Sequence, residues 1–471
     1  MNTTRSADAF CQDFLAYYGH SISRMHLQPR SERERIQLAA LKLRFRQLRD
    51  AIPMLKKLAD GDGIYEIPTL DDVVPLLFDH TMYKSYPPSF LHNNQFDRLT
   101  RWLDKLTAID LSGFDAKDCH SVDDWLTALY DRTPLSLQHT SGSSGVFSFL
   151  PKTKAGYEKF MAQYPVSILQ VFGQEEKLEK YPLNLHAIYP YFRSGSGHLK
   201  LNDLYVKYIC GGEERFHALY PGRLNADVLL LSSRIRAETA KGQLDRLEIS
   251  PDLLARRSEF IELEQKKPEH LARFFDEISQ KLKGCRIFMQ AVPGMLYQMA
   301  KAGLERGERN MFAANSIIIG GGGAKGTVLP DDWDVYVKDY TGADRVIQIY
   351  GMSELLTFNP MCEEGRYHIL PGTIPFILDP DTSRPLPREG TVTGRWAHFD
   401  LVPDTWWGGF ISGDEVTMSW DTPCACGRRT PYLDKKIQRF SEKRGGDDKI
   451  TCAATEESFQ EAMDFLIGFE Q

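Results

Sequence analysis

The N-terminal quarter of the chain carries apolar residues at helical spacing. Residues 31–60 are rich in Leu, Arg and Lys, and Pro53 either interrupts this stretch or begins a second helical segment. Residues 95–108 show the same period. The pattern predicts a mostly helical N-terminal region over residues 1–110.

From Leu135 onward, short apolar runs alternate with helical stretches. The runs predict strands at residues 135–138, 146–150, 184–190, 227–231, 286–291, 315–319 and 346–349. The stretches between them predict helices at residues 153–172, 251–283 and 294–303, the second of these split near Pro268. Such an alternation is typical of an α/β fold, which we expect for a core over residues 111–440.

After Met361 the pattern changes to β-like segments separated by Pro, Gly and Asp turns. Residues 373–378, 390–399 and 415–419 predict a small β-subdomain within the core. One amphipathic helix is expected at residues 457–469, inside a short C-terminal segment at 441–471.

A Gly/Ser loop follows the first strand of the core. Its members are Thr140, Ser141, Gly142, Ser143, Ser144 and Gly145. Glycines let the backbone approach a ligand, and the hydroxyls donate hydrogen bonds to phosphate oxygens. The loop lacks the Lys that a Walker loop needs after its second Gly. It is therefore either an oxyanion-binding loop or an ordinary hairpin turn.

Two further strands also end in loops suited to a ligand. Residues 315–319 run into Gly320, Gly321, Gly322 and Gly323, where a flat base or ribose could lie against bare backbone. Residues 346–349 run into Tyr350, Gly351, Met352, Ser353 and Glu354. A carboxylate beside a phosphate site suits Mg²⁺, so Glu354 is the magnesium candidate. The alternatives are a turn before a helix in the first case and a helix cap in the second.

Three cysteines and one histidine form the candidate metal site. Cys362 and His368 lie close together in the sequence, and Cys424 and Cys426 follow roughly fifty residues later in Gly- and Pro-containing segments. Three thiolates and one imidazole are the ligands of a closed, structural zinc site. The alternative is four ordinary side chains, because lone cysteines are usually buried apolar residues.

Composition restricts the partners and the compartment. The net charge of −7 comes from interspersed charges of both signs, so no nucleic-acid partner is expected. No run of eighteen apolar residues predicts a membrane span, and the first residues do not form a secretory signal. The eight dispersed cysteines fit reduced thiols or metal ligands in a cytoplasmic protein.

Taken in order, these motifs resemble those of the adenylate-forming superfamily. Thr-Ser-Gly-Ser-Ser-Gly resembles that family's phosphate loop, Tyr-Gly-Met-Ser-Glu its Tyr-Gly-x-Thr-Glu segment, and Ile411-Ser-Gly-Asp-Glu its Thr-Gly-Asp segment. Cys424-Ala-Cys-Gly-Arg and Gly446-Asp-Asp-Lys-Ile resemble the phenylacetate–CoA ligase branch, part of which carries zinc at the cysteines. Ser148-Phe-Leu-Pro-Lys is closer to the acyl-protein synthetases of luciferase operons.

The resemblance implies a role for each matching residue. The ATP phosphates would be held by Thr140, Ser141, Ser143 and Ser144, with Gly142 and Gly145 in the same loop, and Ser353 would touch the α-phosphate. The adenine and the acyl pocket would lie against Gly321, Gly322 and Gly323, and Tyr350 would stack on adenine beside Gly351 and Met352. Glu354 would bind Mg²⁺, Asp414 would bind the ribose, and Arg428 or Arg429 would contact ribose or phosphate.

The implied function is ATP-dependent activation of an aryl or aliphatic carboxylic acid to an acyl-adenylate. The acyl group would then pass to CoA, a carrier protein or an amine. The family's C-terminal lid carries a catalytic Lys, whereas here only about twenty residues follow Asp447-Asp448, so residues 441–471 would be a reduced lid. The alternatives are a synthetase that loads its own cysteine, with Cys452 as candidate, and a non-catalytic nucleotide-binding scaffold.

Overall fold

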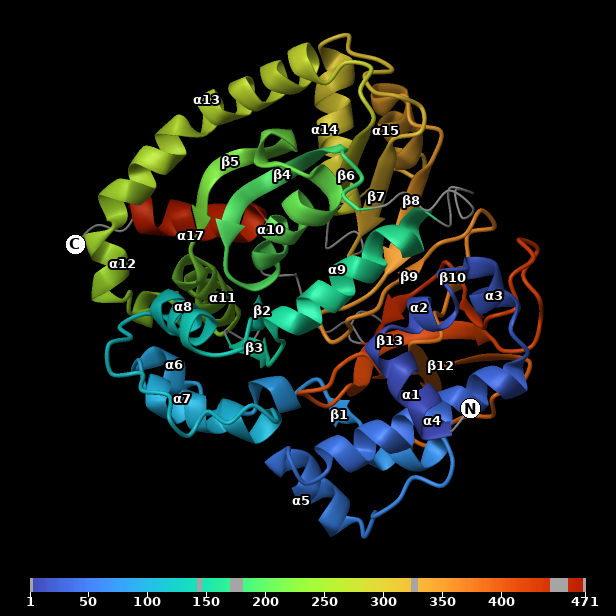
Figure 1. Cartoon of the computed structure of the whole chain (residues 1–471). Helices are drawn as coiled ribbons and strands as arrows, with labels where there is room; N and C mark the ends of the chain where they lie inside the picture. The colour runs from blue at the N-terminus through green and yellow to red at the C-terminus, as the bar shows by residue number, and fades with distance from the viewer. Residues whose placement is uncertain (1–2, 142–145, 170–180, 323–328, 441–455, 469–471) are drawn as a thin grey trace.

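The computed structural model of the chain describes residues 3–141, 146–169, 181–322, 329–440 and 456–468 (Figure 1). Two sheets and a hairpin, with helices packed around them, make up the described part of the chain, so the expected α/β fold is confirmed. None of the helices in these ranges combines the length and the apolar character needed to cross a bilayer.

The first sheet is six-stranded, in the order β5-β4-β6-β7-β8-β9. Its strands are β4 (His186–Gly195), β5 (Phe216–Leu224), β6 (Ile287–Ala291), β7 (Ile317–Gly321), β8 (Val346–Tyr350) and β9 (Asn359–Pro360). All neighbours are parallel except β8 and β9. Helix α14 (Pro293–Glu305) connects β6 to β7, and α15 (Trp333–Thr341) connects β7 to β8. Parallel strands linked by helices place their carboxyl ends at one edge, where open α/β sheets bind ligands.

Two predicted elements of this core are wrong. Residues 227–231 form part of helix α11 (Ala226–Ala240), because the Asn225 side chain accepts hydrogen bonds from the backbone N–H groups of Asp227 and Val228 and so caps a helix. A short apolar run does not by itself separate a strand from a buried helix. The helical pair at 251–283 breaks at Arg256 rather than at Pro268, which lies inside the second helix.

The second sheet is seven-stranded and almost entirely antiparallel. Its strands are β1 (Phe78–Asp79), β10 (Tyr367–His368), β11 (Thr373–Leu378), β12 (Thr391–Asp400), β13 (Gly409–Ser419), β14 (Tyr432–Leu433) and β15 (Gln438–Arg439). The three segments expected in the β-subdomain lie in β11, β12 and β13. Trp396, Trp406 and Trp407 are fully buried in and beside this sheet.

Helices from the N-terminal part of the chain lie against the second sheet (Figure 1). The Gln37 amide donates to the carbonyls of Pro371 and Thr373, at 3.0 and 3.1 Å. Arg44 Nε donates to the Leu401 carbonyl at 2.9 Å. The division of the chain at residue 110 stays a prediction, although these contacts join its two sides.

The helices of the described ranges have the following bounds. They are α1 (Thr3–Gln12), α2 (Phe14–Tyr17), α3 (Ile22–Leu27), α4 (Arg30–Leu48), α5 (Pro53–Gly61), α6 (Ser89–His92), α7 (Phe96–Leu103), α8 (Val122–Arg132), α9 (Lys154–Leu169), α10 (Asn202–Tyr205), α12 (Pro251–Ala255), α13 (Arg257–Lys281) and α17 (Glu456–Gly468), besides α11, α14 and α15.

The C-terminal helix α17 packs between α11 and α13 (Figure 1). Ala462, Met463 and Leu466 are fully buried there. Arg257 Nε, on α13, donates to the Leu466 carbonyl at 2.8 Å. The predicted amphipathic helix is therefore present and firmly docked, while the assignment of 441–471 as a reduced lid stays a prediction.

Candidate active site

A cavity of about 1160 Å³ lies at the carboxyl ends of β4, β6, β7 and β8. Single drug-sized ligands occupy pockets of about 300–1,000 Å³, so this cavity has room for two reactants. The predicted site residues that line it are Thr140, Gly321, Gly322, Gly351, Met352 and Ser353. The structure therefore brings together residues from all three loops that the sequence singled out.

The Gly/Ser loop belongs to a hairpin of β2 (Gln138–Ser141) and β3 (Phe147–Leu150). The hairpin is anchored, because Tyr86 donates its hydroxyl to the Phe147 carbonyl at 2.7 Å and His139 Nε2 lies 2.7 Å from Ser196 Oγ. Gly142, Ser143, Ser144, Gly145 and Gly323 lie outside the described residues, as do the side chain of Ser141 and the hinge aspartates Asp447 and Asp448.

Lys152 follows the hairpin and ends the segment Ser148-Phe-Leu-Pro-Lys, to which the sequence gave no role in the site. Its side chain is buried, lines the cavity, and donates from Nζ to the Leu355 carbonyl at 2.9 Å. Burial lowers the pKa of the ammonium to about 8, although the carboxylates of Glu354 and Asp400 act in the opposite direction. A cation is thus held at the junction of the hairpin and the loop after β8.

Glu354 is surrounded by charged groups of both signs. Burial raises the pKa of its carboxyl, Lys152 and Arg439 lower it, and Asp414 raises it further. A cation bound at this carboxylate would favour the ionised form. Its neighbours Ser353 and Leu355 line the cavity, whereas Glu354, Tyr350 and Asp414 do not, so the magnesium role of Glu354 stays a prediction.

Tyr350 and Asp414 contact each other directly. The Tyr350 hydroxyl donates to Asp414 Oδ2 at 2.9 Å, and Arg439 Nε lies 3.7 Å from Asp414 Oδ1. Burial is the main cause that raises the pKa of the Tyr350 phenol, and the Asp414 carboxylate adds to it. Arg439 was missed because its place beside Asp414 comes from the pairing of β13 with β15, which no local motif announces.

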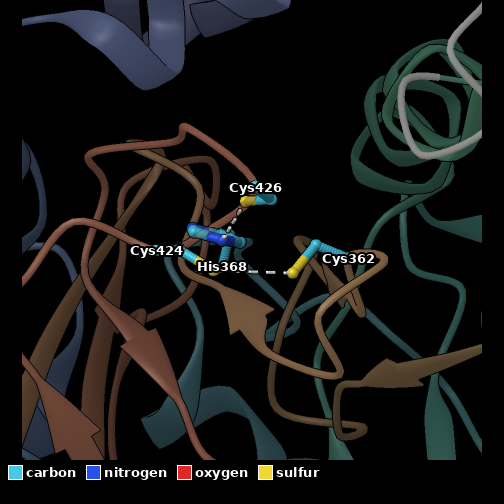
Figure 2. Close-up of side chains that lie close together, drawn as sticks. All are labelled: Cys362, His368, Cys424 and Cys426. Atoms are coloured by element: carbon cyan, nitrogen blue, oxygen red, sulfur yellow. Dashed lines mark hydrogen bonds between the residues drawn. The ribbon is translucent and has the colours of Figure 1, made fainter.

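Cys362, His368, Cys424 and Cys426 converge at one point beside the second sheet (Figure 2). Their ligand atoms all lie within 4.8 Å of one another. The Cys362 and Cys424 sulfurs are 3.9 Å apart, and Cys426 Sγ is 3.2 Å from His368 Nε2. Zn–S bonds of about 2.3 Å in a tetrahedron separate two sulfurs by about 3.8 Å. The four side chains therefore fit a zinc ion.

The protonation of His368 suits a metal, because burial lowers its pKa to about 4 and the imidazole is neutral, as a ligand must be. Burial raises the pKa of the Cys424 thiol to about 12, so a metal bound here would have to displace the thiol proton. The other imidazole nitrogen, His368 Nδ1, lies 3.1 Å from Thr430 Oγ1, which leaves Nε2 for the metal.

The two arginines after the cysteines lie beside this cluster. Arg428 pairs with Glu363 at 3.0 Å, and the Arg429 backbone N–H donates to the His26 carbonyl. Their predicted contact with ribose or phosphate therefore gains no geometric support from the described residues, and it stays a prediction.

Comparison with known proteins concerns the fold. A crystal structure of 2-hydroxyisobutyryl-CoA ligase, in an open conformation with its adenylate 2-HIB-AMP and CoA, matches 88% of this chain and 71% of that chain, at 14% identity and a TM-score of 0.50. ATP-bound MatB from Rhodopseudomonas palustris matches 64% of this chain and 47% of its own at 14% identity, with a TM-score of only 0.33. No protein-family model and no curated protein matches the sequence.

The first likeness shows that the chain has the α/β fold of an acyl-CoA ligase. At this identity it shows the fold alone.

Proposed function

We propose that the protein uses ATP to convert a carboxylic acid into an acyl-adenylate and then passes the acyl group to a thiol or an amine. The observation that carries the proposal is the convergence of Thr140 of the Gly/Ser hairpin, Lys152 and the Gly351–Ser353 segment on one cavity at the carboxyl edge of a parallel sheet. The shared fold with a ligase whose crystal structure holds an acyl-AMP supports it.

In the reaction, a carboxylate oxygen of the acid attacks the α-phosphorus of ATP. A new P–O bond forms, the bond to the bridging oxygen breaks, and pyrophosphate leaves with that electron pair. The Thr140 hydroxyl and the amides of its loop would bind phosphate oxygens, while Ser353 would donate to the α-phosphate. Lys152 would hold positive charge where negative charge gathers, so that positioning and charge neutralisation supply the rate.

Two metal ions complete the proposal. Mg²⁺ held by Glu354 and the phosphate oxygens would neutralise the leaving pyrophosphate. Zn²⁺ held by Cys362, His368, Cys424 and Cys426 would be structural, because four protein ligands leave no position for substrate. It would fix the segment after Tyr350 against the second sheet.

Pyrophosphate release tests the function. Purified protein with ATP, Mg²⁺ and a panel of aryl and straight-chain acids should release pyrophosphate in an acid-dependent manner. Lys152→Met should lose most of this activity, whereas Lys117→Met, at an exposed position, should keep it. Nucleotide binding without release for every acid would contradict the proposal and favour a non-catalytic scaffold. The alternative acceptor Cys452 lies outside the described residues.

A further inference from the structure

We propose that the C-terminal helix α17, together with α13, forms the far wall of the acid-binding cavity and sets the length of the apolar chain that the enzyme accepts. Gln460, Glu461 and Asp464 of α17 line the cavity, as do Leu271 and Phe274 of α13. The inference rests on the proposed function in one respect, namely that the carboxylate of the acid lies near Ser353.

The order of the strands gives the span of the cavity. Ser353 follows β8, whereas α13 packs against β5, at the other side of the sheet. Four strand spacings of about 4.8 Å separate β8 from β5, so the cavity crosses about 19 Å. An extended chain covers about 3.5 Å for every three backbone bonds, so about 19 Å corresponds to roughly 16 bonds.

Small residues and tyrosines line the floor between these two sides. Ala291, Gly321 and Gly322 are small residues at the ends of β6 and β7. Tyrosines line the floor, but the hydroxyls of Tyr164 and Tyr205 both donate to Gln290 Oε1. Their rings therefore face a ligand as apolar surface, which suits a hydrocarbon chain.

The far wall combines apolar side chains with polar ones, because Lys267 of α13 lines the cavity beside the polar residues of α17, which packs against α13. The apolar residues of β5, α11 and α13 that line the cavity are Leu219, Leu224, Leu229, Leu271, Phe274 and Phe275. Leu271 remains 41% exposed although it belongs to the cavity lining, as expected of a side chain that a ligand covers. Glu461 is neutralised by Arg236 at 2.5 Å and accepts from Ser232 at 3.0 Å, so it adds no free charge.

The test is the chain-length dependence of pyrophosphate release with straight acids from butanoate to octadecanoate. In the wild type, kcat/KM should rise roughly fourfold for each added CH₂, the factor expected for burial of one methylene. Leu271→Glu places a charge in the far wall and should lower the ratio of decanoate to butanoate kcat/KM by at least about tenfold. Asp464→Trp, on α17, places a large ring in the far wall and should move the chain length with the highest kcat/KM to shorter acids.

Matched variants separate these effects from general damage. Val335→Glu changes another exposed apolar side chain, on α15, and Asp276→Trp changes an exposed position of α13 outside the cavity lining. Both should keep the wild-type profile. A flat wild-type profile, or identical profiles for Asp464→Trp and Asp276→Trp, would overturn the inference.

Failure of the proposed function can be told apart from failure of the inference. If no acid supports pyrophosphate release, calorimetric titration with decanoate and butanoate still measures binding in the absence of turnover. Tighter binding of decanoate to the wild type, weakened by Leu271→Glu but not by Val335→Glu, would support the role of the far wall in binding the apolar chain. Equal binding of the two acids would refute it.

Discussion

The two sheets of this protein differ in how the space beside them is filled. The parallel sheet leaves a cavity of about 1160 Å³ at the ends of its strands, and small residues such as Gly321 and Gly322 keep it open. The antiparallel sheet is filled with tryptophans, and its edge carries the closed cluster of three cysteines and one histidine. The first sheet therefore offers space for a ligand, whereas the second is packed by large side chains.

The two sheets meet at Lys152. Its neighbours are Glu354, in the loop after β8, and Asp400, at the end of β12 in the second sheet. The backbone N–H groups of Leu356 and Val402 donate to Asp400, which ties the loop to that sheet. Variants beside the cavity should therefore lower turnover most, whereas variants at the Cys/His cluster should mainly lower stability.

Glu354→Gln should have the largest effect. It keeps the shape of the side chain and removes the charge that a magnesium ion needs, so kcat/KM for pyrophosphate release should fall by about 10²–10³-fold. The melting temperature should stay close to that of the wild type. Glu364→Gln, at an exposed position, serves as the control, and normal turnover of Glu354→Gln at limiting Mg²⁺ would contradict the assignment.

Lys152→Met should reduce kcat by about 100-fold, because it removes a positive charge held inside the cavity. In the wild type, kcat should fall as the pH rises through about 8, where the buried ammonium loses its proton. A pH–rate profile without this limb would exclude Lys152 from the reaction.

The low pKa of Lys152 also makes the stability of the folded protein depend on pH, in the opposite direction to turnover. The pKa of Lys152 is about 8 in the folded state and near 10.5 in the unfolded state, so the unfolded state binds more protons between these values. The wild type should therefore gain stability relative to Lys152→Met as the pH rises from 8 to 10.5. Chemical denaturation of both proteins across this range measures the difference.

Asp414→Ala should weaken ATP binding by about 1.5–3 kcal/mol, the usual worth of hydrogen bonds to a charged acceptor. Because Asp414 also accepts the Tyr350 hydroxyl, Tyr350→Phe should produce a smaller part of the same loss. Asp381→Ala, at an exposed turn of the same sheet, should leave affinity unchanged. Wild-type affinity in a folded Asp414→Ala protein would remove this residue from the site.

Cys424→Ser should affect stability more than turnover. Loss of one thiolate should release the zinc, lower the melting temperature by about 5 °C or more, and raise the KM for ATP only a few-fold. Cys285→Ser, outside the cluster, should change none of these. Elemental analysis comes first: a preparation never exposed to chelator that holds less than about half an equivalent of zinc would leave four ordinary side chains.

The parts of the site that could be predicted from the sequence are those formed by residues adjacent in the chain. The three loops and the Cys/His pairs could be found because each is a short motif with its own chemistry. The roles of Lys152 and Arg439 could not be predicted, although Lys152 ends a quoted motif, because the burial of Lys152 and the ion pair of Arg439 arise from packing and strand pairing. Residues 227–231 were misassigned for a related reason, since a cap from Asn225 decided between two structures that the apolar run allows equally.

The pairing of β1 with β13 has a consequence for how the protein is made. Phe78 lies opposite Phe410, and the Trp407 indole donates to the Leu76 carbonyl across 331 residues of sequence. Loop closure over such a separation is slow, and a ribosome adds about 5–20 residues per second. The N-terminal helices must therefore wait many seconds for their partner sheet to be synthesised, with their apolar faces open to chaperones throughout.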